Sequence, residues 1–158
     1  MTATTDAPTT EDTTPAPTSV TMTKALNQAL RDSLAEDENV VVYGEDVGRL
    51  GGVFRVTEGL RAEFGSNRVW DSPLAESGIV GTAIGMAMNG MRPVVEMQFD
   101  AYAYPAFEQI VSHVAKMRNR TKGRVSLPIT IRIPSVSYTH LTLPTKEDEC
   151  RSRWSPYH

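Results

Sequence analysis

The sequence predicts an α/β domain in which a mostly parallel sheet carries helices on both faces. Short apolar runs alternate with amphipathic stretches along the chain, which is typical of strands joined by crossover helices. The first apolar run, residues 40–43, is apolar at every position, as expected for a strand that is buried on both faces. Gly, Asp and Pro follow several of the runs and indicate loops there.

The first half of the predicted domain contains two strands and two helices. Residues 22–34 place four apolar side chains on one ridge of a helix, and the run 40–43 forms the first strand. A turn-rich loop follows over residues 44–52. A short helix is expected over residues 57–64, stopped by Gly65, and a brief strand over residues 68–70.

The second half repeats this alternation. A helix is predicted over residues 76–88, a strand over 93–97, a further helix that carries Phe107, Ile110, Val111 and Val114, and a strand over 129–133. Ligands of parallel sheets bind beyond the carboxyl ends of the strands. The loops after Tyr43, Trp70 and Met97 are therefore expected to lie on one rim and to form the binding site.

Composition narrows the class of protein. The 158 residues carry a net charge of −3, from 16 basic and 19 acidic side chains, which gives no electrostatic reason to expect nucleic acid or a membrane as partner. No apolar run reaches the length that spans a bilayer. The one cysteine, Cys150, excludes a disulfide framework within the chain, and a cytoplasmic location fits best.

The two ends of the chain differ in composition from the part between them. Residues 1–19 are rich in Thr, Ala and Pro, and we expect them to be a disordered leader. Residues 20–134 are expected to form the domain. Residues 135–158 have neither helical nor strand periodicity, and we interpret them as a non-native tail.

Five motifs in a fixed order give the chain a family resemblance. They are GEDVG at 44–48, GGVF at 51–54, DSPLAESGIVG at 71–81, RPVVEMQF at 92–99 and YPAFEQI at 104–110. In this order and spacing, over about residues 22–134, the chain resembles the beta subunit of pyruvate and branched-chain 2-oxo acid dehydrogenases. The resemblance implies the pyrimidine-binding domain of a thiamine-diphosphate enzyme, of the kind also found in transketolases.

The resemblance gives Glu76 the central role. It implies that the Glu76 carboxyl bonds the ring nitrogen of the cofactor's aminopyrimidine, which favours the imino form of the neighbouring amine. That imine can then accept the proton of the thiazolium carbon. The alternative interpretation of Glu76 is an acid at a helix N-terminus, where the helix dipole favours negative charge.

The resemblance also implies further binding residues. Leu74 and Gln98 match positions that line the pyrimidine site, and Tyr102 matches a tyrosine that stacks near the ring. The alternative interpretation of Tyr102 is a half-buried aromatic at a helix start. The hydroxyl of Thr130 and the carbonyls of Leu127 and Ile129 match a structural potassium site, since oxygen ligands suit a hard cation.

Partners and alternatives also follow from the resemblance. It implies an alpha subunit that binds the diphosphate with magnesium, a second beta subunit and a lipoyl-bearing acyltransferase core. Relatives continue with a Gly-rich loop and a histidine where this chain has residues 135–138, so we expect the fragment alone to be inactive.

The alternative function is that of the pyrimidine domain of another thiamine enzyme, such as a transketolase. A nucleotide-binding module is unlikely because residues 44–52 match neither phosphate-binding glycine motif.

Overall fold

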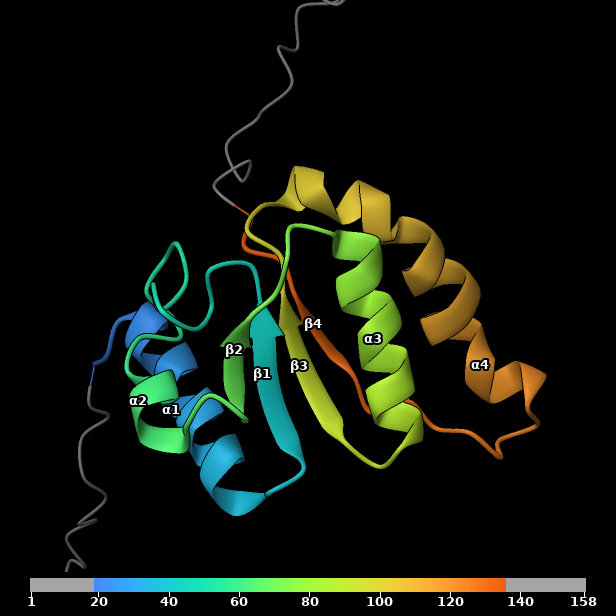
Figure 1. Cartoon of the computed structure of the whole chain (residues 1–158), viewed down its shortest axis with the longest axis horizontal. Coiled ribbons are helices and arrows are strands. Elements are labelled where there is room, and N and C mark those ends of the chain that lie inside the picture. Colours follow the sequence, from blue (N-terminus) through green and yellow to red (C-terminus); the bar gives the residue numbers. More distant parts are fainter. Residues whose placement is uncertain (1–18, 136–158) are drawn as a thin grey trace, which may run out of the picture.

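The computed structural model describes residues 19–135 as one parallel sheet between two layers of helices (Figure 1). The predicted leader and tail lie outside the described residues, apart from the positions that adjoin the domain. Between residues 19 and 135, no helix combines the length and the apolar character needed to cross a lipid bilayer. The elements are, in order, α1 Met22–Glu36, β1 Val40–Gly44, α2 Leu60–Phe64, β2 Val69–Asp71, α3 Glu76–Met88, β3 Arg92–Glu96, η1 Asp100–Ala106, η2 Gln109–Val114, α4 Ala115–Arg120 and β4 Thr130–Arg132.

All strand pairs in the sheet are parallel, and the strand order is β2-β1-β3-β4. In the middle of the sheet, Val42 of β1 pairs with Val69 of β2 on one side and with Val94 of β3 on the other. Because the strands run in one direction, their carboxyl ends meet at the same edge. The prediction that the loops after Tyr43, Trp70 and Met97 share one rim is therefore confirmed.

The side chains of β1 alternate between the two helical layers. Val40 and Val42 belong to one buried cluster, which they share with apolar side chains of α1 and α2. Val41 and Tyr43 belong to another, which they share with Ile79 and Ala83 of α3. Figure 1 shows α1 and α2 on one side of the sheet and α3 with α4 on the other. The continuous apolar run of β1 therefore reflects burial on both faces, and the predicted fold class is confirmed.

The helix predicted after β3 is divided into three segments of different geometry. η1 is a 3-10 helix that contains Pro105, η2 is a π-helix and α4 is a short α-helix. Proline has no N–H to donate, and a π-helix turns each side chain by a different angle from an α-helix. Phe107, which the helical spacing placed on the apolar face, is consequently 61% exposed.

The helix predicted over residues 57–64 begins only at Leu60. Gly59 has a left-handed backbone, and Thr57 closes the preceding loop instead of joining the helix. The buried Thr57 hydroxyl donates to the carbonyl of Val47 at 2.8 Å, and its backbone N–H donates to the carbonyl of Gly51 at 3.0 Å. The loop after β1 is thus folded back onto itself at the rim of the sheet.

Candidate functional site

Gly44 allows β1 and β3 to come very close at the rim. It has a φ of +153°, and a Cβ atom at this position would overlap the backbone oxygen of Glu96. The next residue, Glu45, donates its backbone N–H to that same oxygen at 3.2 Å. A glycine is required here because only a residue without a side chain permits this approach. The close approach places Glu45 between the ends of the two central strands.

Glu45 is a carboxylic acid enclosed in the protein interior. It is 1% exposed, its Oε2 accepts the backbone N–H of Gln98 at 3.0 Å, and its Oε1 has no hydrogen-bond partner among the described residues. Burial raises the pKa of the Glu45 carboxyl, because removal from water disfavours the charged form. The N–H of Gln98 opposes this shift, and the neighbouring Glu76 carboxyl raises the pKa further.

Glu76 is the first residue of α3, which follows β2 and a four-residue connection. The position agrees with the prediction of a helix start beyond the carboxyl end of a strand. Negative charge is favoured there by the helix dipole, and the N-cap residue Ala75 supplies no side-chain acceptor of its own. Two of the predicted site residues therefore lie near Glu45. Gln98 donates its backbone N–H to Oε2 of Glu45, and the Glu76 carboxyl is near enough to raise the pKa of Glu45.

The side chain of Gln98 is held by a second acid from the loop after β1. Its Nε2 donates to Oδ2 of Asp46, the residue next to Glu45. Sequence reasoning missed both acids. The available signal was their position, because Glu45 and Asp46 directly follow a strand that is buried at every residue, where a carboxyl group needs a specific reason to occur.

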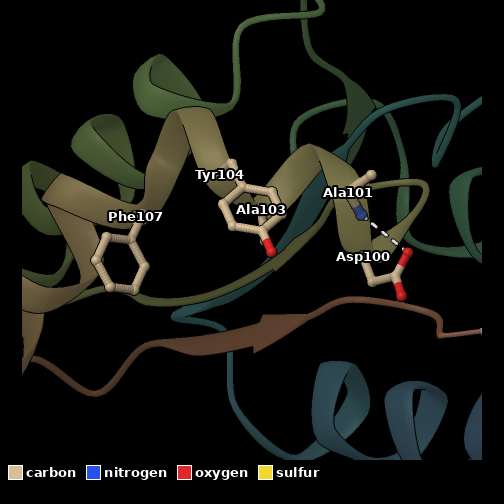
Figure 2. Close-up of a pocket in the computed structure, with 5 residues that line it drawn as sticks. All are labelled: Asp100, Ala101, Ala103, Tyr104 and Phe107. Carbon is tan, nitrogen blue, oxygen red and sulfur yellow. Dashed lines mark hydrogen bonds between the residues drawn. The ribbon is translucent and has the colours of Figure 1, made fainter. Parts of the chain in front are cut away.

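Two predicted site residues lie on the same rim but do not contact the carboxyl groups in the described structure. Tyr102, on η1, is 43% exposed and packs edge-to-face on Phe99 with ring centres 5.8 Å apart. Leu74 is 76% exposed. A hollow of about 450 Å³ lies along η1. Figure 2 shows the rings of Tyr104 and Phe107, which line it and are exposed. The lining of this hollow includes neither Glu45 nor Glu76, so it does not enclose their carboxyl groups.

The three residues predicted to bind potassium lie away from the carboxyl groups, where the chain enters β4. The carbonyl of Leu127 accepts the N–H of Ile129 at 2.9 Å, and Thr130 pairs with Val94 in the middle of β3. Within residues 19–135 there is no group of three or more His, Cys, Asp or Glu side chains that could hold a metal ion.

A buried ion pair supports the rim from below. Glu96, the last residue of β3, is 3% exposed and is paired with Arg132, the last residue of β4. Burial raises the pKa of the Glu96 carboxyl, and the Arg132 guanidinium opposes that shift. Glu96 thus has a charged partner, whereas Oε1 of the equally buried Glu45 has none among the described residues.

Residues 18–135 match the family model described as "Transketolase, pyrimidine binding domain". The chain belongs to this family. Its similarity to individual proteins covers the same part of the sequence. It is 62% identical over 116 residues to the pyruvate dehydrogenase E1 component subunit beta of Leifsonia xyli. It is 59% identical over 117 residues to the 3-methyl-2-oxobutanoate dehydrogenase subunit beta of Mycobacterium tuberculosis, and 54% identical over 115 residues to the pyruvate dehydrogenase E1 component subunit beta of Bacillus subtilis.

These matches cover 73–74% of this chain and 34–35% of each relative. The chain therefore spans about a third of the length of the curated relatives it matches. The resemblance to 2-oxo acid dehydrogenase beta subunits, which the ordered motifs indicated, is confirmed over this part of the sequence.

Proposed function

We propose that this chain is the pyrimidine-binding part of the beta subunit of a thiamine-diphosphate-dependent 2-oxo acid dehydrogenase. The observation that carries the proposal is the position of Glu76 at the start of α3, near the buried acid Glu45, whose Oε2 accepts the backbone N–H of Gln98. The site lies beyond the carboxyl ends of parallel strands, where this class of fold binds its ligands. The pyrimidine-binding family of the domain and the names of its relatives support the same function.

The residues present fit an aminopyrimidine. The ring carries a basic nitrogen, and Glu76 offers a carboxyl group at a helix start, where it is available to a ligand on the rim. When bound, thiamine diphosphate supplies the carbon nucleophile that attacks the 2-oxo group. Glu76 holds a proton between its carboxyl and the pyrimidine ring nitrogen. Leu74, Gln98 and Tyr102 surround the ring with one apolar, one polar and one aromatic side chain.

Glu45 assists Glu76 in this proposal. Because burial raises its pKa, Glu45 keeps its proton to a higher pH than an exposed glutamate does. The unpartnered Oε1 can carry that proton and donate it in a hydrogen bond to a Glu76 carboxylate oxygen. This bond holds the Glu76 carboxyl in place and leaves its second oxygen for the ring nitrogen.

The exposed apolar side chains on the rim support the proposal of a partner subunit. Tyr104 and Phe107 are 80% and 61% exposed and line one hollow, and Leu74 is 76% exposed after β2. Exposed apolar patches favour protein contacts. We assign this surface to the alpha subunit, which would bind the diphosphate with magnesium. The further partners in the proposal are a second beta subunit and a lipoyl-bearing acyltransferase core. The proposal also includes potassium bound by Leu127, Ile129 and Thr130, and a cytoplasmic location.

The substrate in the proposal is pyruvate or a branched-chain 2-oxo acid. Relatives of both kinds match with similar identity, 62% for the pyruvate enzyme of Leifsonia xyli and 59% for the 3-methyl-2-oxobutanoate enzyme of Mycobacterium tuberculosis. Both substrates therefore belong in the assay. Transketolase activity is measured in parallel, because the family name covers that enzyme as well.

The proposal is tested in an assembled enzyme. Residues 20–134 are joined to the remaining part of the Leifsonia xyli beta subunit and produced with its alpha subunit. We expect decarboxylation of a 2-oxo acid and acylation of a lipoyl domain, and no turnover from the 158-residue chain alone. An assembled enzyme that binds thiamine diphosphate but acts only as a transketolase would contradict the proposal.

The role of Glu76 is tested by Glu76→Gln in the same assembly. An amide cannot exchange the proton, so turnover should fall about 100-fold or more, which is the usual size of general acid–base catalysis. Cofactor affinity should change much less, because the amide still forms a hydrogen bond. Glu36→Gln, at the end of α1, is the matched control and should leave both quantities unchanged. Normal turnover of Glu76→Gln would remove Glu76 from the mechanism.

A further inference from the structure

Asp46 has an unusual backbone conformation beside the candidate site. Its φ is +57°, in the left-handed region that residues with a Cβ atom seldom adopt and that Asp tolerates better than most. Its carbonyl accepts the N–H of Gly52 at 2.9 Å, which closes the loop after β1. With this backbone, the Asp46 carboxylate reaches across the rim to the loop after β3. Strained residues that persist in a folded protein often serve a functional site.

Two successive acids hold Gln98 at two different points. Oε2 of Glu45 accepts its backbone N–H, and Oδ2 of Asp46 accepts its side-chain Nε2. An amide whose nitrogen is bound to a carboxylate has its oxygen directed the other way. No described residue donates a hydrogen bond to Oε1 of Gln98. Oε1 of Gln98 is therefore an acceptor that a ligand on the rim can use.

We infer that Asp46 is a positioning residue, which orients the Gln98 amide so that Oε1 accepts a hydrogen bond from the amino group of the bound aminopyrimidine. This inference rests on the proposed function. Without Asp46 the amide can turn over and present its NH₂ to the ligand's amino group, where two donors face each other. Asp46 thereby makes the site selective for an amino group at that ring position.

The first test separates the side chain of Asp46 from its backbone. In the assembled enzyme described above, Asp46→Gly keeps the left-handed conformation, since glycine adopts it freely, and removes the carboxylate. We expect about tenfold weaker binding of thiamine diphosphate by calorimetry, the size of one hydrogen bond to an ordered polar group. The melting temperature of the variant should not fall. Asp46→Asn retains an acceptor and tolerates the same φ, so it should bind within about threefold of the unsubstituted protein.

The second test changes the ligand. Oxythiamine diphosphate carries an oxygen in place of the amino group and cannot donate the proposed hydrogen bond in the same way. Asp46→Gly should weaken binding of thiamine diphosphate but not that of oxythiamine diphosphate, because the freed Gln98 amide can turn its NH₂ toward the ligand's oxygen. An equal loss for both ligands would mean that Asp46 only supports the loop, which would overturn the inference.

A control variant accounts for the change in backbone strain. Lys122, in the turn after α4, also has a left-handed backbone, with a φ of +53°. Lys122→Gly should leave the affinity for both ligands unchanged. If the unsubstituted enzyme binds no thiamine diphosphate, the proposed function is wrong. The aminopyrimidine is then not the ligand of Gln98 either. If it binds thiamine diphosphate and Asp46→Gly binds it equally well, only the role of Asp46 is overturned.

Discussion

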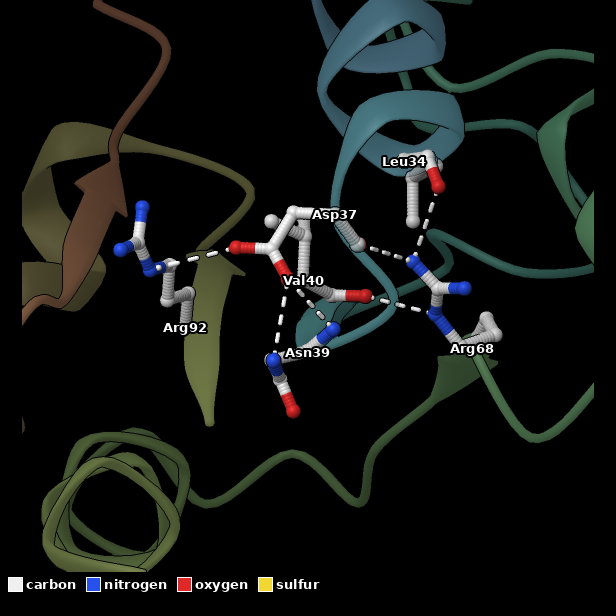
Figure 3. A network of polar contacts seen from close by, with 6 residues as sticks. All are labelled: Leu34, Asp37, Asn39, Val40, Arg68 and Arg92. Atoms are coloured by element: carbon white, nitrogen blue, oxygen red, sulfur yellow. Dashed lines mark hydrogen bonds and ion pairs between the residues drawn. The ribbon is translucent and has the colours of Figure 1, made fainter. Parts of the chain in front are cut away.

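The two ends of the same parallel sheet satisfy their polar groups in opposite ways. At the amino ends of the strands, Figure 3 shows a closed network in which the guanidinium of Arg68 donates to the carbonyls of Val40, Leu34 and Asp37 at 2.7–3.0 Å. At the carboxyl ends, two buried side-chain atoms, Glu45 Oε1 and Ser72 Oγ, have no partner among the described residues.

The network at the amino ends has a structural explanation. The last carbonyls of a helix have no partner within it, and Arg68 binds the carbonyl of Leu34 near the end of α1 and that of Asp37 just beyond it. The Asp37 carboxylate accepts the backbone N–H of Asn39 at 2.8 Å and pairs with Arg92 at 3.3 Å. The Asn39 N–H, more than any other neighbour, lowers the pKa of the Asp37 carboxyl.

The contrast indicates where the fold gives up stability for binding. A buried polar atom without a hydrogen-bond partner lowers the free energy of unfolding by about 1–3 kcal/mol. We therefore expect such an atom where a ligand or another chain supplies the missing hydrogen bond. The amino ends need no such completion. The carboxyl ends combine an acid with one unpartnered oxygen, an aspartate with a left-handed backbone and exposed aromatic rings.

Gly44→Ala should cause the largest loss of stability, because it separates β1 from β3 at the rim. The new Cβ would overlap the backbone of Glu96, which cannot rotate away as a side chain can. We expect the free energy of unfolding to fall by about 4 kcal/mol or more, measured by urea denaturation. Gly85→Ala is the control, because a Cβ added at Gly85 would have no atom from outside its own helix within 4 Å. It should stabilise the chain by about 0.5–1 kcal/mol. An equal change in the free energy of unfolding for the two variants would contradict the close approach of β1 and β3 at Gly44.

Arg68→Ala should destabilise the chain by about 3 kcal/mol, at the opposite end of the sheet. It leaves three partly buried carbonyls without their donor, at about 1 kcal/mol each. Arg49→Ala, on the rim loop, is the control because the Arg49 side chain is exposed and has no described side-chain bond. Urea denaturation of both variants tests whether the amino-end network contributes this stability. Similar, small effects would show that the network is dispensable.

Glu45→Gln should have a smaller effect that depends on pH. The pKa of Glu45 is raised in the folded protein above its ordinary value of 4.5, so its contribution is most favourable below that pH and is lost as the pH rises through the folded pKa. The amide does not ionise, so the stability of the Glu45→Gln variant relative to the unsubstituted protein should increase as the pH rises. Denaturation midpoints at several pH values test this. If the stability of the two proteins changed with pH in the same way, the raised pKa of Glu45 would be contradicted.

Local sequence patterns predicted the central strands well, because their signal is burial on both faces. The run at 40–43 predicted β1, and the apolar residues after Pro93 predicted β3, each to within a residue. The signal failed where helix geometry departs from 3.6 residues per turn. Nothing in the spacing of Phe107, Ile110 and Val114 distinguishes an α-helix from the π-helix that forms there.

The sequence by itself determined the layers of the fold, the shared rim and the position of Glu76 at a helix start. These follow from hydrophobic period, loop residues and motif order, which are local along the chain. Only the tertiary structure decided that Glu76 and Gln98 lie near Glu45, and that Asp46 holds the Gln98 amide. Those contacts join residues 31 to 53 positions apart, and they depend on the register of parallel strands and on the missing side chain of Gly44. No local pattern encodes such distances, because they are set by how the strands pack.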